Sequence, residues 1–248
     1  MKLEVRSYML DRRSGKNLYL QIIEILTEDL EHMPFGEQIA TETELAERYK
    51  VSRGTIRQAI ARLESQGLVF KIQGKGTFKG GHLVQHASFI MGNFTQQLLA
   101  QQMIPGIRNV SVKKEQADEI IASYLAIPVG ADVWSVRRDR LANGVPINFS
   151  TGYIPTSVVS KLRASDLEMS IIDMLGKKFG HRVYTATNLC SATLSDKYVA
   201  KRLNIEEGAA LMVLEFIGMN QKNCPVLYDK SYLIGNTFSL RIDQIISQ

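Results

Sequence analysis

The chain has 248 residues, of which 45% are hydrophobic and 22% are charged, and its formal net charge is +5. This length suits one or two domains, each with its own hydrophobic core. Its two cysteines, Cys190 and Cys224, lie 34 residues apart, which argues against the disulfide framework of a secreted protein. No stretch reaches the ~18 apolar residues of a membrane span, and the first residues lack the apolar segment of a signal peptide. We therefore expect a soluble, cytoplasmic protein.

The charges are distributed unevenly in the first third of the chain. Residues 24–47 contain eight carboxylates and no Lys or Arg, whereas residues 48–81 contain eight Lys or Arg and a single acid, Glu64. The second segment therefore has a net charge of +7 within 34 residues. A concentrated basic segment favours a polyanionic partner, and its helical pattern fits double-stranded DNA.

Hydrophobic spacing and capping residues predict three helices in this part of the chain. Residues 17–33 have apolar side chains at helical intervals, which indicates an amphipathic helix. Thr41 and Glu44 have the spacing of a capping box, which begins a second, short helix. Ser52 is a favourable N-cap for a third helix, which stops at Gly67. The core-facing side of the third helix consists of Ile56, Ala59, Ile60 and Leu63.

The third predicted helix places Arg53, Thr55 and Arg57 away from its apolar side. Two helices joined by a tight turn, the second one cationic at its start, are typical of a helix-turn-helix that inserts its second helix into the major groove. Residues 69–79 then alternate and turn at the Gly-Lys-Gly sequence of residues 74–76, which predicts a β-hairpin wing. A cationic helix face alone is more often a solvated surface, but the order of these elements favours DNA binding.

The remaining part of the chain contains an internal repeat. The segment Leu125–Ala131 recurs as Leu203–Ala209, at an offset of 78 residues. Each copy follows an amphipathic helix and precedes a strand, a turn and a second strand that begins at Pro146 or Pro225. Chance similarity of two loops is the alternative, but the shared lengths and order argue against it. The repeat predicts an α+β domain with an antiparallel sheet and helices packed against it.

One group of residues in this domain suits the binding of an anion. Arg138 and Arg140 lie two apart on a predicted strand and therefore on one face of the sheet. Arginine forks suit phosphate, and Thr95 and Ser170 lie near predicted helix starts, where free amides also favour anions. Surface ion pairs of the two arginines are an equally plausible alternative. The sequence has no nucleophile beside a base, no metal-spaced cluster and no cofactor motif, so we expect no enzyme, no metal and no cofactor.

Five motifs occur in order within residues 17–79: N-L-Y-L-Q-I, T-E-T-E-L-A-E-R-Y, V-S-R-G-T-I-R-Q-A-I, L-E-S-Q-G-L-V and Q-G-K-G-T-F. This segment resembles the winged helix-turn-helix domain of GntR-type bacterial transcription regulators. Family members often have Arg where this chain has Thr43, so this is a DNA-contact position at which the chain departs from the family. The resemblance implies further contacts from the third helix and the wing, by Arg53, Thr55, Arg57, Gln73, Gly74 and Lys75.

The second domain has the motifs R-D-R-L-A-N-G-V-P-I, N-F-T-Q-Q and S-I-I-D-M-L. It resembles the effector-binding UTRA domain of the HutC subfamily, whose fold is related to chorismate lyase. The resemblance implies that a phosphate binds at Thr95, Arg138, Arg140 and Ser170. Ser150 stands where sugar-phosphate sensors usually have a Glu for sugar hydroxyls. The resemblance therefore implies an anionic effector, such as a sugar phosphate, whose remainder differs from an amino-sugar phosphate.

The sequence as a whole predicts a homodimeric, ligand-responsive transcription repressor that binds a palindromic operator. We expect the DNA-binding domain at residues 1–79, a linker at 80–88, and the effector-binding and dimerisation domain at 89–248. Two winged helices on neighbouring half-sites are expected because one alone buries too little surface for useful affinity. The alternatives are an enzyme of chorismate-lyase-like fold with a DNA-binding head, and a DNA-binding protein that needs no ligand.

Overall fold

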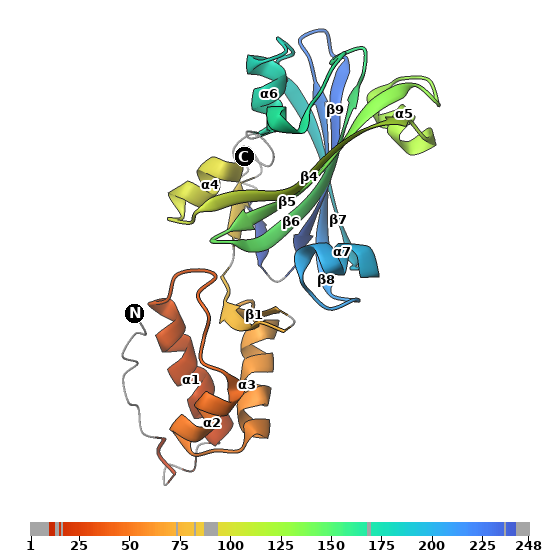
Figure 1. Cartoon of the computed structure of the whole chain (residues 1–248). Helices are drawn as coiled ribbons and strands as arrows, with labels where there is room; N and C mark the ends of the chain where they lie inside the picture. Colours follow the sequence, from red (N-terminus) through yellow and green to blue (C-terminus); the bar gives the residue numbers. More distant parts are fainter. Residues whose placement is uncertain are drawn as a thin grey trace, which may run out of the picture. The chain divides into compact units, whose positions relative to one another are not determined.

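The computed structural model describes residues 10–12, 15, 17–72, 74–81, 83–86, 94–167, 170–235 and 237–241. The chain divides into two compact units, Met1–His82 and Leu83–Gln248 (Figure 1). No helix among the described residues is long and apolar enough to cross a membrane.

The first unit contains three helices followed by a β-hairpin. Helices α1 and α2 both pack against α3, as the apolar spacing predicts. The centre of their shared core is fully buried: Ile22, Ile56, Ile60 and Leu63 have no exposed surface. The elements are α1 (Leu18–Glu31), α2 (Glu42–Tyr49), α3 (Arg53–Ser65), β1 (Val69–Ile72) and β2 (Gly76–Lys79).

Local capping fixes where the second and third helices begin. The backbone N–H of Glu44 donates to Thr41 Oγ1 at 3.2 Å, and Glu44 Oε2 accepts from the Thr41 N–H at 2.8 Å, so the predicted capping box is confirmed. Ser52 Oγ accepts from the Thr55 N–H at 3.1 Å, which confirms the predicted N-cap. Between the two helices, Lys50 takes a left-handed conformation with φ of 52°, which makes the tight turn.

The hairpin β1–β2 is braced by the segment that precedes α2. The two strands are antiparallel, with Val69 opposite Lys79 and Ile72 opposite Gly76. Gln38 donates from Nε2 to the Lys75 carbonyl at 2.8 Å. Gly76 has φ of +124°, and a Cβ at this position would lie 2.6 Å from Gln38 Nε2. Residue 76 must therefore be glycine for the turn and its brace to coexist.

The second unit is built on one six-stranded antiparallel sheet in the order β4-β5-β6-β9-β8-β7. Its strands are β4 (Pro105–Gln116), β5 (Asp132–Ala142), β6 (Val145–Pro155), β7 (Thr185–Leu194), β8 (Ala210–Met219) and β9 (Pro225–Ile234). Its helices are α4 (Phe94–Ala100), α5 (Glu119–Leu125), the 3-10 helix η2 (Ala164–Leu167), α6 (Ile171–Lys177) and α7 (Lys197–Leu203). The segment expected to be a linker contributes a strand: β3 (Leu83–His86) pairs in parallel with β10 (Phe238–Arg241).

The predicted repeat is confirmed by the backbone. The strand order is symmetric, so that β4, α5, β5 and β6 correspond to β7, α7, β8 and β9. Helix α5 begins at the N-cap Asp118 and α7 at the N-cap Asp196. Both helices end in a left-handed residue, Ala126 with φ of 50° and Asn204 with φ of 56°. The similar loops read from the sequence are thus two copies of one helix-to-strand connection.

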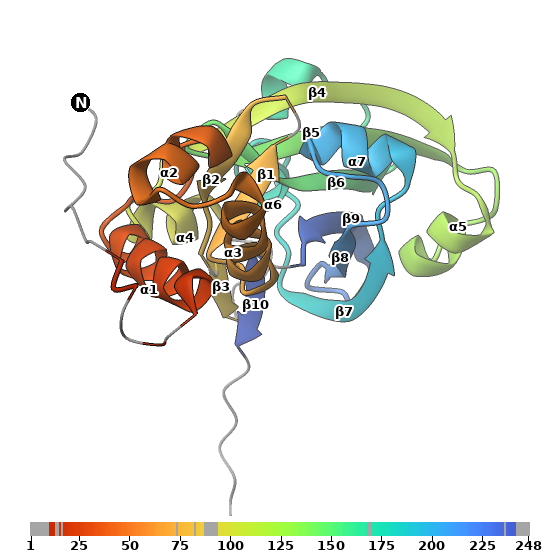
Figure 2. The ribbon, with the colours of Figure 1, turned by 90° about the horizontal axis from the view of Figure 1, so that it is seen from below.

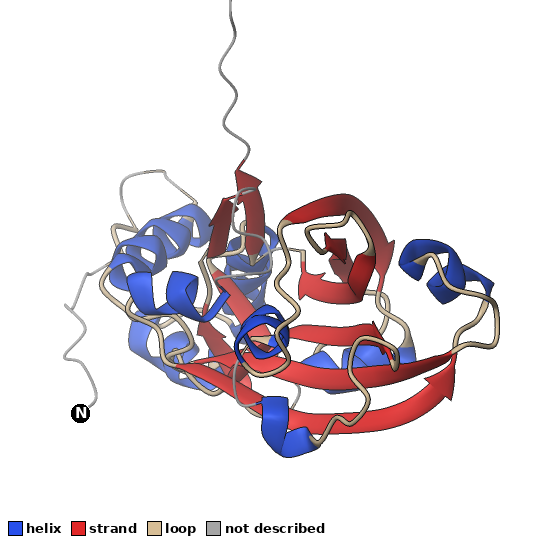
Figure 3. Ribbon diagram, turned by 90° about the horizontal axis from the view of Figure 1, so that it is seen from above, coloured by secondary structure: helices blue, strands red, loops and turns tan. Residues whose placement is uncertain are grey.

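The sheet separates two sets of helices (Figure 3). Helices α5 and α7 cover one face, where their apolar residues pack on Tyr228 and Phe149, respectively. The opposite face carries Arg138 and Arg140, because residues two apart on a strand share a face. Helices α4 and α6 lie on this second face, as the stacking of Phe94 on Arg140 shows for α4.

Candidate DNA-binding and effector-binding sites

Helix α3 presents a cationic surface next to its buried side. Arg53 is the first residue of the helix and is exposed, and Arg57 is exposed one turn later. Thr55 lies between them, with its Oγ1 atom 2.9 Å from Ser52 Oγ. The first turns of the helix are therefore open to a ligand, as the recognition helix of a helix-turn-helix requires.

An ion pair that the sequence analysis missed involves one of these residues. Arg57 donates from Nε to Glu42 Oε2 at 3.2 Å, and 64% of the Arg57 side chain is exposed. Exposed ion pairs contribute ~0.2–1 kcal/mol, so a DNA phosphate or base can compete for this guanidinium. The pair joins the two helices of the motif and orients Arg57 before DNA is present.

The tip of the wing is also open. Gly74 and Lys75 are exposed, and the Lys75 N–H donates to the Ile72 carbonyl at 3.0 Å to close the turn. Gln73, a further predicted DNA contact, lies outside the described residues. Thr43 is exposed on the first turn of α2. The described DNA-contact candidates thus come from α2, from α3 and from the hairpin turn.

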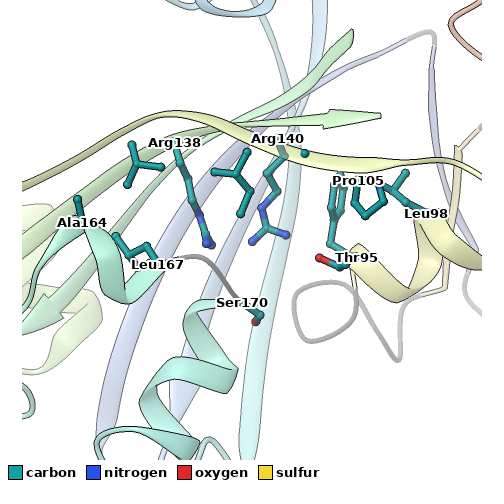
Figure 4. A pocket seen from close by; sticks show the side chains of 12 residues that line it. Thr95, Leu98, Pro105, Arg138, Arg140, Ala164, Leu167 and Ser170 are labelled. Carbon is teal, nitrogen blue, oxygen red and sulfur yellow. The ribbon is translucent and has the colours of Figure 1, made fainter. Parts of the chain in front are cut away.

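In the second unit, four predicted effector-binding residues line one cavity of about 410 Å³ (Figure 4). Arg138 and Arg140 extend from β5 toward Ser170, at the start of α6, and Thr95, on α4. These residues come from three segments far apart in the sequence. The rest of the lining is Phe94, Leu98, Pro105, Gly106, Ile107, Val110, Ala164 and Leu167.

The two arginines are buried rather than exposed, so the alternative of surface ion pairs is wrong. Arg138 is 1% exposed and Arg140 is 7% exposed. Burial and, to a smaller extent, the charge of Arg140 lower the pKa of Arg138 to about 9, against the opposing effect of Asp229. Burial also lowers the pKa of Arg140. The guanidinium of Arg140 lies 4.8 Å from the centre of the Phe94 ring, which holds it in place.

The hydroxyl of Ser170 has an unused hydrogen-bonding capacity. Ser170 is the N-cap of α6, yet its side chain makes no capping hydrogen bond, and Oγ has no partner among the described residues. Thr95 is exposed on the first turn of α4. Both hydroxyls lie in the same cavity as the two guanidinium groups (Figure 4). Together these groups could donate several hydrogen bonds to one anion.

Ser150 occupies a different position from the other four candidates. It lies directly opposite Arg138 on β6 and has no exposed surface. It is not among the residues that line the cavity. Its Oγ atom, like Asp229 Oδ2 on the neighbouring strand β9, has no hydrogen-bond partner among the described residues. Ser150 therefore belongs to a polar layer of the sheet beside the arginines.

A carboxylate between the two arginines was missed by the sequence analysis. Asp139 points to the opposite face of β5 and is fully buried. It accepts hydrogen bonds from Arg108 Nε at 3.2 Å, Asn109 Nδ2 at 2.7 Å and Arg202 Nε at 2.7 Å. These bonds connect β5 to β4 and α7 at the position between Arg138 and Arg140. The Arg-Asp-Arg alternation was the one sequence signal that could have indicated this role.

The first unit is a winged helix-turn-helix with an exposed cationic helix, and the second unit has a cavity suited to an anion. Together they define a class of ligand-responsive DNA-binding regulators. Comparison with protein families agrees: residues 18–78 match the bacterial regulatory proteins of the gntR family, and residues 100–239 match the UTRA domain. The chain belongs to the gntR family of regulators that carry a UTRA domain. It is a DNA-binding transcription regulator and not an enzyme.

Two of its relatives are named as transcriptional repressors, and the similarity spans almost the whole length of each. The chain is 25% identical over 232 residues to the HTH-type transcriptional repressor NagR of Bacillus subtilis, covering 93% of this chain and 96% of NagR. It is 28% identical over 236 residues to the probable fructoselysine utilization operon transcriptional repressor of Escherichia coli, covering 94% and 97%. Among solved structures, PhnF from Mycobacterium smegmatis shares the fold, with a TM-score of 0.62 at 22% identity, over 91% of this chain and 100% of PhnF.

Proposed function

We propose that this protein is a cytoplasmic, homodimeric repressor of the HutC subfamily, which leaves a palindromic operator when a small anionic metabolite binds. The named relatives in the comparison are repressors, which supports the direction of regulation. Residues Arg53, Thr55 and Arg57 of α3, Thr43 of α2 and the wing contact the operator. The effector binds at Arg138, Arg140, Thr95 and Ser170.

The observation that carries the proposal is the burial of two cations around one cavity. Two guanidinium groups on the same face of one strand repel each other, and burial removes the water that would screen them. Among the described residues, Asp229 is the carboxylate whose negative charge opposes the lowered pKa of both arginines, so one negative charge faces two positive ones there. An anion in the cavity would relieve this imbalance and accept hydrogen bonds from the Ser170 and Thr95 hydroxyls. A phosphate has the charge and the number of acceptor oxygens to do both.

The names of the relatives suggest a carbohydrate derivative. One relative is named for the utilization of fructoselysine, a sugar derivative. A sugar phosphate is therefore a suitable first class of effector to test. Most of the cavity lining is apolar, and Ser150, which does not line the cavity, supplies no carboxylate for sugar hydroxyls. The part of the effector beyond its anionic group should therefore be less hydroxylated than an amino sugar.

The effector can release DNA only if it prefers one arrangement of the two DNA-binding units over another. A ligand shifts such an equilibrium by its difference in affinity for the two states, and a large shift requires about 5 kcal/mol. The cavity is contacted by α4, which follows the segment that joins the two units in the sequence. Helix α4 is thus the cavity-lining element closest in sequence to the DNA-binding unit. A movement of α4 on ligand binding would be passed on through the connecting segment.

The test is a double variant, Arg138→Ala with Arg140→Ala, on an operator selected from random DNA duplexes. Wild-type protein should release this operator in the presence of at least one member of a sugar-phosphate panel, and the matching free sugars should have no effect. The double variant should bind the operator as tightly as wild type but ignore the phosphorylated compounds. Arg137→Ala is the matched control, because Arg137 is on the same strand but faces away and pairs with Glu115. A double variant that still releases DNA at the wild-type concentration would place the effector elsewhere.

A further inference from the structure

The segment that precedes α1 is attached to the first unit by several contacts. The backbone N–H of Asp11 donates to Gln21 Oε1 at 2.8 Å, and the Asp11 carbonyl accepts from Gln21 Nε2 at 2.9 Å. Gln21 belongs to α1 and is buried, and Leu10 packs against the hydrophobic core of the unit. Residues 10–12, which we call the N-terminal arm, are therefore held against the helices.

Arg12 connects this arm to the turn of the helix-turn-helix. Its guanidinium donates from Nη2 to the Lys50 carbonyl at 2.6 Å. Lys50 is the C-cap of α2, and its left-handed conformation makes the turn toward α3. Three peptide units separate Lys50 from Arg53, so their Cα atoms lie at most ~11 Å apart. Arg12 is therefore bound close to the residues with which α3 begins, and Figure 2 shows the unit from this end of α3.

Most of the hydrogen-bonding capacity of Arg12 is available to a partner outside the chain. A guanidinium has five N–H donors, and Arg12 makes one hydrogen bond to the described part of the chain. The residue is exposed and forms no ion pair with a described carboxylate. Arg57, in contrast, must leave Glu42 before it can bind DNA. An exposed guanidinium in a fixed position is well suited to a phosphate.

The charge of the surrounding sequence favours the same kind of partner. Residues 1–17 contain five Lys or Arg and two acids, which gives this segment a net charge of +3 from its side chains. The bond to Lys50 also has a structural value, because a cation near the last carbonyls of a helix interacts favourably with the helix dipole. A structural role and a DNA contact therefore have to be separated by experiment.

We propose that Arg12 binds a backbone phosphate of the operator, beside the major groove that receives α3. The inference rests on the assignment of α3 as the recognition helix. The first turns of such a helix contact the base edges, so a cation on the turn before it meets the sugar-phosphate backbone that borders the groove. The bond to Lys50 fixes the guanidinium before DNA is present, so little side-chain freedom is lost on binding.

Two substitutions of Arg12 separate a phosphate contact from a structural role. Arg12→Gln keeps an amide that can donate to the Lys50 carbonyl but removes the charge, whereas Arg12→Lys keeps the charge. Fluorescence anisotropy of the full-length protein measures binding to the selected operator and to an unrelated duplex over a range of salt concentrations. Arg12→Gln should weaken both about tenfold at low salt and reduce the salt slope by about one for each DNA-binding unit bound. Arg12→Lys should retain most of the slope.

Arg62→Gln is the matched control, because it removes the same charge from an exposed position in the last turn of α3. It should leave the salt slope unchanged and alter the affinity by less than about twofold. Gln21→Leu keeps Arg12 but removes the amide that attaches the arm to α1. It should weaken DNA binding when introduced alone and add no further loss to Arg12→Gln, since both changes act on one contact.

Three outcomes would overturn the phosphate contact. The first is a salt slope in Arg12→Gln equal to that of the wild type. The second is a loss confined to the operator, which would indicate a base contact. The third is an equal loss in Arg12→Gln and Arg62→Gln, which would reflect net charge alone. In each case, weakened operator binding in Arg53→Ala would leave α3 in place as the recognition helix.

Discussion

Arg57 Nε in α3 lies 3.2 Å from Glu42 Oε2 in α2, so a cation assigned to DNA recognition is paired with a carboxylate of the neighbouring helix. The pair orients the guanidinium but places a negative charge close to the surface that must meet the phosphates. Glu42 should therefore limit DNA affinity while it helps to direct Arg57.

We expect Glu42→Gln to tighten binding to DNA of any sequence several-fold at low salt, because it removes a repulsive charge and frees Arg57. Fluorescence anisotropy over a range of salt concentrations measures the change. Glu47→Gln is the control, since it removes the same charge from an exposed position on the same helix. Equal effects of the two substitutions would show that the change reflects net charge and not the pair with Arg57.

Arg53→Ala and Arg57→Ala should each weaken binding to the selected operator without unfolding the protein. If either side chain contacts a guanine edge, its loss costs ~1–3 kcal/mol and relaxes selectivity at that base pair. Arg62→Ala provides the comparison, because Arg62 is exposed in the last turn of the same helix and away from its recognition end. Unchanged operator affinity in both variants would contradict the assignment of α3 as the recognition helix.

Asp139→Asn should destabilise the second unit by about 3 kcal/mol, because it leaves Arg202 and Arg108 without their buried carboxylate. Urea denaturation of the full chain measures the loss. Asp132→Asn removes the partner of Lys114 in an exposed ion pair on the same strand and should cost well under 1 kcal/mol. Similar losses in the two variants would mean that Asp139 contributes no more than a surface charge.

Inorganic phosphate should raise the melting temperature of the wild-type protein more than chloride does at the same ionic strength. A ligand that binds only the folded state adds stability as its concentration exceeds the dissociation constant, reaching about 2.7 kcal/mol at a hundredfold excess. Arg138→Ala with Arg140→Ala should abolish the difference between the two anions. A persistent phosphate effect in this variant would indicate a second anion site.

The elements of the fold that depend on near neighbours in the chain could be predicted from the sequence. The capping box of Thr41 and Glu44, the N-cap Ser52 and the repeat at Leu125 and Leu203 all involve residues close to one another or a visible pattern. The shared face of Arg138 and Arg140 followed from strand periodicity alone. Their burial did not, because it depends on α4 and α6 covering that face.

Interactions between distant segments escaped prediction for a physical reason. Asp139 and Arg202 are 63 residues apart, and Glu42 and Arg57 are 15 apart on different helices. Each pair exists only because helix packing brings two chain segments together, and nothing in the local sequence indicates the partner. The repeat predicted from the sequence began with the helix before each copy, so it included neither β7 nor its place at the edge of the sheet.

The bulge at Asn109 has a consequence for how far an assembly could grow. If both edges of the sheet were regular and neutral, copies of the chain could pair at either edge and add without limit to form a fibre. The irregular and charged β4 opposes such growth at one of the two edges. A regular, neutral β4 should therefore make the chain prone to edge-to-edge polymerisation, which the register shift near Asn109 opposes.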